Sequence, residues 1–245
     1  YDKFRMWRYP EYRPVSFDVQ KSSDSYKVTT EYAPFGKFCS VTMTYQIYAD
    51  GAVRVSEKMN DKGSLSEAPD MFRFGMKLAM PGEFSTLDFY GLGPWDNYCD
   101  RKSGAIMGHY TQKVQDQYWY GYVRTQESGT KCDLRWLKVT DAAGTGLEIT
   151  SDVRFSGSAL PFSQKDMDSA LSEPRPRPNP TNEQHGNATH SLELLALAHN
   201  DARSLGTTYV NFDLKEMGVG GIDSWGRLPL DKYMVHPAEY EFNVV

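Results

Sequence analysis

The sequence predicts an all-β chain that folds as a large antiparallel β-sandwich. Apolar and polar residues alternate with a period of two in many short segments, which is the pattern of strands that bury one face. Gly, Pro and Asp-Gly pairs separate these segments, as expected at hairpin turns. Aromatic residues make up 13% of the chain and favour pleated sheets. Helical patterns are scarce by comparison.

The expected strands follow one another along most of the chain. The alternating segments are 15–19, 26–30, 41–47, 53–55, 72–80, 87–89, 147–149, 210–214 and 240–244. Asp50-Gly51 predicts a tight turn after the third segment, and Pro81-Gly82 ends the fifth. Residues 163–166 can form a capping box that opens one short helix to about Leu171, whereas residues 192–199 fit a helix or a strand.

We expect one domain over residues 1–245, because the chain shows no internal repeat and no clean linker. A chain of 245 residues can bury a large core without disulfides. Four prolines fall between Pro174 and Pro180, within a Pro-rich excursion at about 172–206. Such a stretch donates few backbone hydrogen bonds, so we expect an exposed extended loop. A ligand for a partner domain is the alternative.

Composition and spacing exclude several classes of protein. The net charge of −5 argues against a nucleic-acid partner. No apolar run reaches the length of a membrane span, so we expect no membrane partner. Cys39, Cys99 and Cys132 fit neither a disulfide framework nor a metal knuckle, and we expect buried or idle thiols. The histidines lack metal-ligand spacing, so we expect no metal and no cofactor in this chain.

Paired carboxylates are the remaining catalytic candidates. Asp96 and Asp100 are close in sequence, and Asp223 lies in another loop. Glycoside hydrolysis needs two carboxylates at about 5 Å, or further apart for inversion. Carboxylates in turns also cap backbone N–H groups. Both roles stay open from these residues.

Three segments carry a more specific signal. Residues 91–101 read GLGPWDNYCDR, residues 122–129 read YVRTQESG and are followed by CDLRWL, and residues 217–226 read MGVGGIDSWG. In this order they resemble GxGPxENYxDR, YVxPQENG with its R-W strand, and MGVGGDDSWG of the C-terminal domain of family 2 β-galactosidases. The resemblance runs from near Trp7 to the C-terminus. Asp96, Cys99 and Ile222 depart from the residues usual in that family.

The resemblance implies a supersandwich that is galactose-mutarotase-like in fold. It also implies a C-terminal domain of a β-galactosidase that hydrolyses terminal β-D-galactosides with retention. In that family the glutamate acid/base and the glutamate nucleophile lie on a separate barrel domain. We therefore expect no catalytic residue in this chain and no activity from the chain alone.

The resemblance further implies the partners of the chain. These are a galactoside substrate, the remaining domains of the parent enzyme including its catalytic barrel, and in some parents further copies in a homo-oligomer. Divalent and monovalent cations of the parent are expected to bind in the other domains. The chain starts at Tyr1 without an initiator Met, so we expect a fragment or a processed piece. Its compartment, cytoplasmic or periplasmic, stays open.

Trp225 is the site residue that the resemblance singles out, as one wall of the galactose pocket. An indole can pack against the apolar C–H face of galactose and exclude water. About 60 Å² of burial would contribute ~1.5 kcal/mol, or roughly tenfold in affinity. Gly218, Gly220 and Gly221 are expected to fold the loop sharply enough to project the ring. A buried Trp at a strand end is the alternative.

The first motif yields three further expectations. Gly91, Gly93 and Pro94 suggest a hinged loop. We expect Asp96-Asn97 to border the mouth of the pocket. We expect Asp100-Arg101 to form a local pair, or Arg101 to cap a carbonyl group.

Two other functions compete with this one. An autonomous carbohydrate-binding module would bind galactosides alone, through exposed aromatic residues such as Trp95, Trp119 or Trp225. A sugar mutarotase would need an acid and a base that converge on the ring oxygen, and His109 and His236 are the histidines considered for that role.

Overall fold

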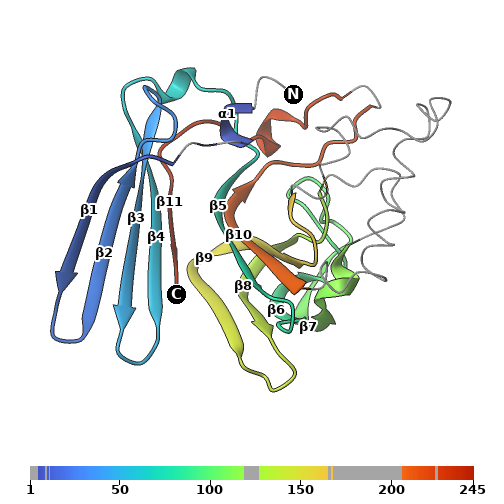
Figure 1. Ribbon diagram of the computed structural model, residues 1–245. Helices are drawn as coiled ribbons and strands as arrows, with labels where there is room; N and C mark the ends of the chain where they lie inside the picture. The colour runs from blue at the N-terminus through green and yellow to red at the C-terminus, as the bar shows by residue number, and fades with distance from the viewer. Residues whose placement is uncertain are drawn as a thin grey trace, which may run out of the picture.

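Two antiparallel sheets make up the computed structural model, which describes residues 5–8, 10, 12–118, 127–164, 167, 206–223 and 226–245 (Figure 1). The all-β sandwich expected from the alternation is confirmed. A four-residue helix, α1 (Arg5–Arg8), lies near the N-terminus. None of the helices in the described part is long and apolar enough to span a membrane.

The first sheet has five strands in the order β1-β2-β3-β4-β11. Their bounds are β1 (Pro14–Lys21), β2 (Ser25–Tyr32), β3 (Cys39–Tyr48), β4 (Val53–Asp61) and β11 (Glu241–Val244). The predicted Asp50-Gly51 turn joins β3 to β4, and Gly51 adopts a φ of 93° that favours glycine. β11 comes from the far end of the chain and closes the sheet beside β4.

The second sheet has six strands in the order β5-β10-β9-β8-β6-β7. Their bounds are β5 (Arg73–Pro81), β6 (Thr86–Gly93), β7 (Ile106–Lys113), β8 (Lys131–Thr140), β9 (Gly146–Leu160) and β10 (Thr207–Glu216). The alternation did not predict β7, which is an edge strand whose residues are mostly exposed or half-buried on both faces. Pro81 ends β5, as expected.

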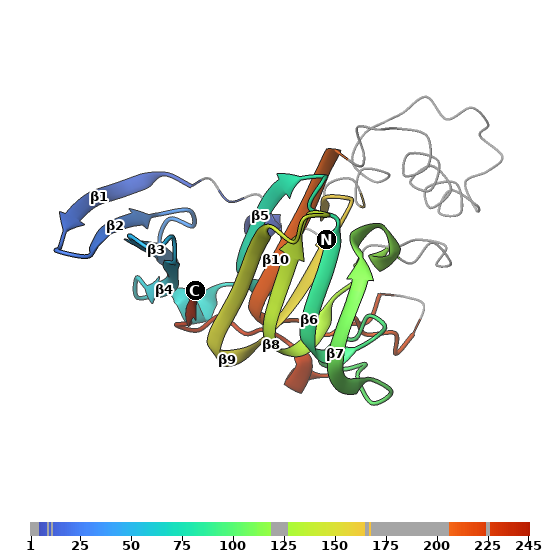
Figure 2. The same ribbon diagram turned by 90° about the horizontal axis from the view of Figure 1, so that it is seen from below.

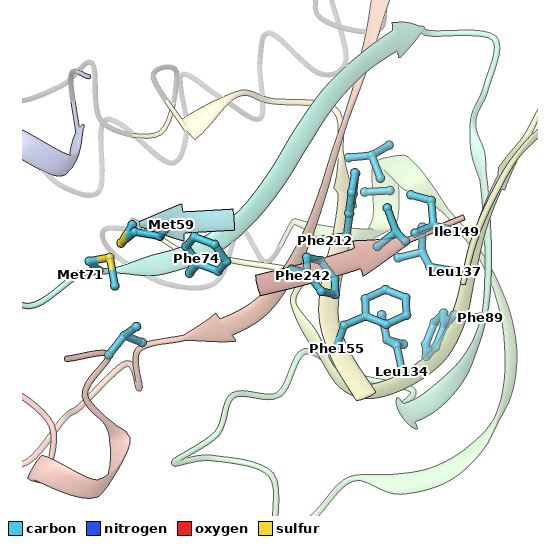
Figure 3. Close-up of a cluster of buried hydrophobic side chains, with 14 of the residues drawn as sticks. Met59, Met71, Phe74, Phe89, Leu134, Leu137, Ile149, Phe155, Phe212 and Phe242 are labelled. Atoms are coloured by element: carbon cyan, nitrogen blue, oxygen red, sulfur yellow. The ribbon is translucent and has the colours of Figure 1, made fainter. Parts of the chain in front are cut away.

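The core lies where β11 and β4 of the first sheet pack against β9 and its neighbours (Figure 3). Phe242 of β11 is fully buried, and its ring lies 6.2 Å from that of Phe155 on β9. Val245 and Thr150 exchange two backbone hydrogen bonds, of 2.9 and 3.0 Å. The last residues of the chain therefore join the two sheets.

The first sheet extends well beyond this core. In the view from below, β1 and β2 reach away from the second sheet (Figure 2). Every residue of β1 is exposed, including Phe17 and Val19, whose side chains are apolar. Only part of the first sheet is therefore covered by the second.

Two predicted features fall largely outside the described residues. The N–H of Met167 donates to the carbonyl of Ser163, which is the bond of one α-helical turn. The rest of the helix predicted to about Leu171 lies outside the described residues. So do residues 192–199 and almost all of the Pro-rich excursion at 172–206.

Glu57 makes the stability of the fold depend on pH. Burial of its carboxyl group on β4 raises the pKa to about 8, from an ordinary value of 4.5. A raised carboxyl pKa means that the folded state holds the proton more tightly, so stability falls as pH rises from about 4.5 to about 8. We expect Glu57→Gln to raise the free energy of unfolding at pH 8 by about 4 kcal/mol, with little change at pH 4.5.

Urea denaturation at the two pH values measures this difference. Glu241→Gln is the matched control, because Glu241 is exposed on the opposite face of the same sheet. An equal effect of Glu57→Gln at both pH values would contradict the assignment.

Candidate functional site

The three motif segments of the sequence meet in one place, which we call the motif cluster (residues 91–101, 127–137 and 216–223). The N–H of Asn97 donates to Thr130 O at 2.8 Å, which joins the first segment to the second. Cys99 Sγ donates to the carbonyl of Glu216 at 3.4 Å, which joins the first to the third. Segments separated by up to 117 positions in sequence thus form one structural unit.

Asp100 makes the closest link within the motif cluster. Its Oδ1 accepts the N–H of Val219 at 3.1 Å, and its Oδ2 accepts the N–H of Gly220 at 2.8 Å. Hydrogen bonds to a charged acceptor are stronger than neutral ones. The carboxylate therefore clamps the glycine-rich loop through its backbone, which is a role that does not depend on the side chain at 219.

Two different structural constraints require glycine in this loop. A Cβ on Gly218 would collide with the Asp100 carboxylate, so the clamp requires glycine at this position. Gly220 and Gly221 adopt φ values of 74° and 90°, in the left-handed region that side chains disfavour. The sharp fold expected of this loop is therefore seen in its backbone up to Asp223.

The expected Asp100-Arg101 pair is not formed. The Arg101 guanidinium instead lies 3.2 Å from Asp96 Oδ2 and over the ring of Tyr98 at 5.1 Å. The physical reason is that the Asp100 carboxylate faces the backbone N–H groups of residues 219 and 220. The ion pair between Arg101 and Asp96 therefore lies within the first motif.

Asn97, which was expected at the mouth of the pocket, is buried within the loop of the first motif. It is 2% exposed, and its Nδ2 donates to Leu92 O at 2.9 Å and to Trp95 O at 3.0 Å. Its Oδ1 accepts the N–H of Cys132 at 2.9 Å. Because both polar atoms of this buried amide bond to backbone groups, Asn97 fixes the shape of the loop.

The predicted hinge at Gly91, Gly93 and Pro94 is not supported by the packing. Both glycines belong to β6 and pair with β7. A Cβ on Gly91 would lie 2.6 Å from Leu134 Cδ2, and one on Gly93 would lie 2.8 Å from the ring of Tyr110. These glycines allow close approach of side chains. Pro94 O also accepts a hydrogen bond from Gln112 Nε2 at 3.1 Å.

Asp96 does line an open pocket of about 930 Å³, together with Trp95. The indole of Trp95 is 73% exposed, although its loop is held by Asn97. The other lining residues are mostly polar: Thr86, Pro94, Thr111, Gln112, Lys113, Asp116, Gln117 and Lys131. Its two aspartates and two lysines balance in formal charge.

Lys131 is a buried residue that lines this pocket. Its Nζ donates to Gln117 Oε1 at 2.9 Å and to Gly129 O at 3.1 Å. Burial lowers the pKa of the ammonium group to about 8, although the nearby Asp96 carboxylate opposes the shift. The side chain therefore holds residues 117 and 129 together.

A buried ionic group that the sequence analysis missed supports the motif cluster. Arg73 of β5 forms salt bridges with Glu127 at 3.3 Å, with Asp213 at 3.7 Å and with Glu216. Burial raises the pKa of the Asp213 carboxyl well above its usual range, although Arg73 opposes the shift. Only the motif position of Glu127 could have pointed to this group, since its members are scattered along the chain.

The remaining candidate acids and bases do not converge. Asp223 Oδ1 accepts the N–H of Arg227 at 3.3 Å, so it caps backbone as Asp100 does. His109 pairs with Asp88 on β6, beside the β7 edge, whereas His236 pairs with Asp70 near the β5 edge. Five strand spacings, about 24 Å, separate these edges. One sugar ring cannot contact both histidines.

All three cysteines are free thiols, and Cys39 and Cys132 are buried. Burial raises the pKa of Cys39 to about 11 and that of Cys132 to about 12. Burial also raises the pKa of Cys99. Among the described residues, no three His, Cys, Asp or Glu side chains are grouped so that they could hold a metal ion.

Trp225, on which the pocket-wall expectation depends, lies outside the described residues, as does Trp119. The structure describes Asp223 and Gly226 on either side of Ser224-Trp225. What the structure establishes is therefore the anchoring of the loop that leads to Trp225.

Comparison with known proteins identifies relatives of this chain. A family model described as the β-galactosidase small chain matches residues 2–245. The chain is 29% identical over 227 residues to a β-galactosidase of Priestia megaterium and 30% identical over 232 residues to one of Lactobacillus delbrueckii subsp. bulgaricus. These alignments cover 92% and 94% of this chain but 19% of each relative. The chain thus spans about one fifth of the length of these relatives.

Removing the Asp100 clamp should release the glycine-rich loop. We expect Asp100→Ala to speed amide hydrogen exchange at Val219 and Gly220 at least about tenfold, because two charge-assisted hydrogen bonds are lost. The global free energy of unfolding should fall by about 2 kcal/mol. Asp141→Ala is the matched control, since it removes an acceptor of two backbone N–H groups in another hairpin. Unchanged exchange at residues 219 and 220 in Asp100→Ala would rule out the clamp.

Proposed function

Because the chain belongs to the β-galactosidase small-chain family, we propose that it is the C-terminal domain of a β-galactosidase and supplies one wall of the galactose pocket through Trp225. The whole enzyme would hydrolyse terminal β-D-galactosides with retention. The two glutamates for that reaction would lie on a separate barrel domain. The domain would adopt the galactose-mutarotase-like supersandwich, and the two antiparallel sheets are compatible with that fold.

The observation that carries this proposal is the Asp100 clamp. It fixes the backbone of Val219 and Gly220 a few residues before Trp225. A loop that is already ordered loses less entropy when a ligand binds. An anchored loop can therefore hold an indole ready to stack on the apolar face of galactose, which is a role suited to a binding wall.

The three carboxylates that the sequence analysis considered have other partners in the structure. Asp100 and Asp223 accept backbone N–H groups, and Asp96 pairs with Arg101. A retaining glycosidase needs a carboxylate pair at about 5–5.5 Å on either side of a sugar. The catalytic pair, and any cations that assist it, would therefore be supplied by other domains of the parent enzyme.

Trp225→Ala tests the pocket wall in the full-length enzyme. We expect KM for lactose to rise about tenfold with kcat changed less than about twofold, because stacking stabilises bound substrate and transition state alike. Steady-state kinetics measures both constants. Ile222→Ala is the control, since it truncates an exposed apolar side chain of the same loop without removing a ring. An unchanged KM in Trp225→Ala would refute the pocket wall.

One observation favours the second candidate, an autonomous carbohydrate-binding module. Trp95 presents an exposed indole on a loop held by Asn97, beside a pocket of polar, charge-balanced residues. Aromatic rings beside hydrogen-bonding side chains suit neutral polyhydroxylated ligands. The module would bind galactosides without the parent enzyme.

Titration of the 245-residue chain with galactose and lactose separates the two functions. Under our proposal one wall binds galactose with a Kd weaker than about 10 mM, because few contacts cannot offset the cost of immobilising a ligand. The binding module predicts saturable binding that Trp95→Ala weakens about tenfold. Phe17→Ala is the control, because Phe17 is an aromatic residue of similar exposure on the other sheet. Ligand-observed NMR detects binding in this range.

A further inference from the structure

The first sheet has one apolar face and one polar face throughout its width. Side chains directly opposite on neighbouring strands share a face. The register places Phe17, Thr30, Met43, Glu57 and Phe242 in one row. The next rows on the same face are Val19, Val28, Tyr45, Val55 and Val244, and then Lys21, Tyr26, Ile47 and Val53. The opposite face carries residues such as Ser16, Asp18, Thr29 and Thr44.

Only one side of this apolar face is covered by the second sheet. Phe242 and Val244 on β11 are buried in the core, whereas Phe17 on β1 is 68% exposed. We call the uncovered part the open face: Phe17, Val19, Tyr26, Tyr45, Ile47 and Val53, each more than one third exposed. Alternation of this kind normally marks a buried face. The open face therefore has the apolar composition of a buried surface, although its side chains are exposed.

Glu57 lies on the same face, between the covered and the open parts. It stands opposite Met43 on β3 and Phe242 on β11. Its Oε2 atom is buried and has no hydrogen-bond partner among the described residues. A buried acceptor without a donor costs stability, so such groups are rare in complete structures. A hydrogen-bond donor from outside the described residues would satisfy this oxygen.

We propose that the open face is the docking surface for another segment of the full-length polypeptide, apolar in character and with a hydrogen-bond donor or cation opposite Glu57. The proposal rests on the function proposed above, in which this chain is one domain of a longer enzyme. The relatives have about four fifths of their length outside the matched part. A covering segment from that length would bury the apolar side chains and pair the orphan oxygen.

The size of the open face favours a tethered segment over a second copy of the chain. From β1 to β4 and from Phe17 to Lys21 the face measures about 14 Å by about 14 Å, or roughly 200 Å² of sheet. Independent partners of stable complexes bury about 800 Å² each. A covalently linked segment needs less area, because linkage makes the contact intramolecular.

Hydrogen exchange in the full-length enzyme tests this surface. We expect backbone amides of β1 and β2 to exchange at least about tenfold more slowly in the full-length enzyme than in the 245-residue chain. Phe17→Asp in the full-length enzyme should abolish this protection while exchange in β9 and β11 stays slow, which shows that the core is intact. Ser16→Asp is the matched control, because it adds the same charge to the polar face of the same strand.

Glu57→Gln provides a second readout. In the 245-residue chain it should raise the melting temperature at pH 8, whereas in the full-length enzyme the gain should vanish or reverse, because a donor would pair with the ionised carboxylate. A persistent gain in the full-length enzyme would exclude the donor.

Other outcomes would overturn the docking surface without touching the pocket wall. Equal exchange of β1 and β2 in the two proteins would show that nothing covers the open face. Protection in the 245-residue chain that grows with its concentration, with a dimer mass by light scattering, would assign the face to a second copy. A native protein of only 245 residues would instead refute the proposed function itself.

Discussion

The carboxylate of Asp100 is the contact on which the candidate site depends. It receives two backbone N–H groups of the glycine-rich loop, and it leaves room for no side chain at residue 218. Asn97 and Arg101 then fix the segment that carries Asp100, through a buried amide and a salt bridge to Asp96. A loop held in this way by backbone contacts can change its exposed side chains without losing its shape, so recognition and anchoring are carried by different residues.

The same separation of tasks is seen at the level of the sheets. The six-stranded sheet packs with β11, β4 and the start of β3 to make the core, whereas β1, β2 and the rest of β3 continue the apolar face beyond it. Glu57 lies at the boundary, where burial raises its pKa and no described residue donates a hydrogen bond to its buried oxygen. An uncovered apolar face and an unpaired buried acceptor both lower the stability of the fold. Docking of another segment of the polypeptide would remove both costs. The physical features of the first sheet thus agree with the small share of the relatives that this chain spans.

Errors in the predicted roles have a common physical origin. The sequence suggested a hinge at Gly91 and Gly93. In the structure, side chains of β7 and β8 pack so closely on β6 that a Cβ at either glycine would collide with them. Asn97 looks like a polar surface residue, yet the carbonyls and the N–H that it bonds come from residues 92, 95 and 132. Arg101 and Asp100 are adjacent in sequence but face different partners. For Gly91, Asn97 and Asp100, a deciding contact comes from a residue more than 30 positions away in the chain.

Alternation by itself determined the all-β class, most of the strands and the turn at Gly51, because period-two burial and positive φ are local properties. The motifs determined the family, and their order pointed to the loops that matter. Tertiary structure alone decided that Asp100 binds the loop before Trp225, that Arg73 gathers three carboxylates, and which part of an apolar face is left uncovered. Those outcomes depend on which segments the sheets bring together, and hydrogen bonding and burial act over a few ångströms in space whatever the distance in sequence.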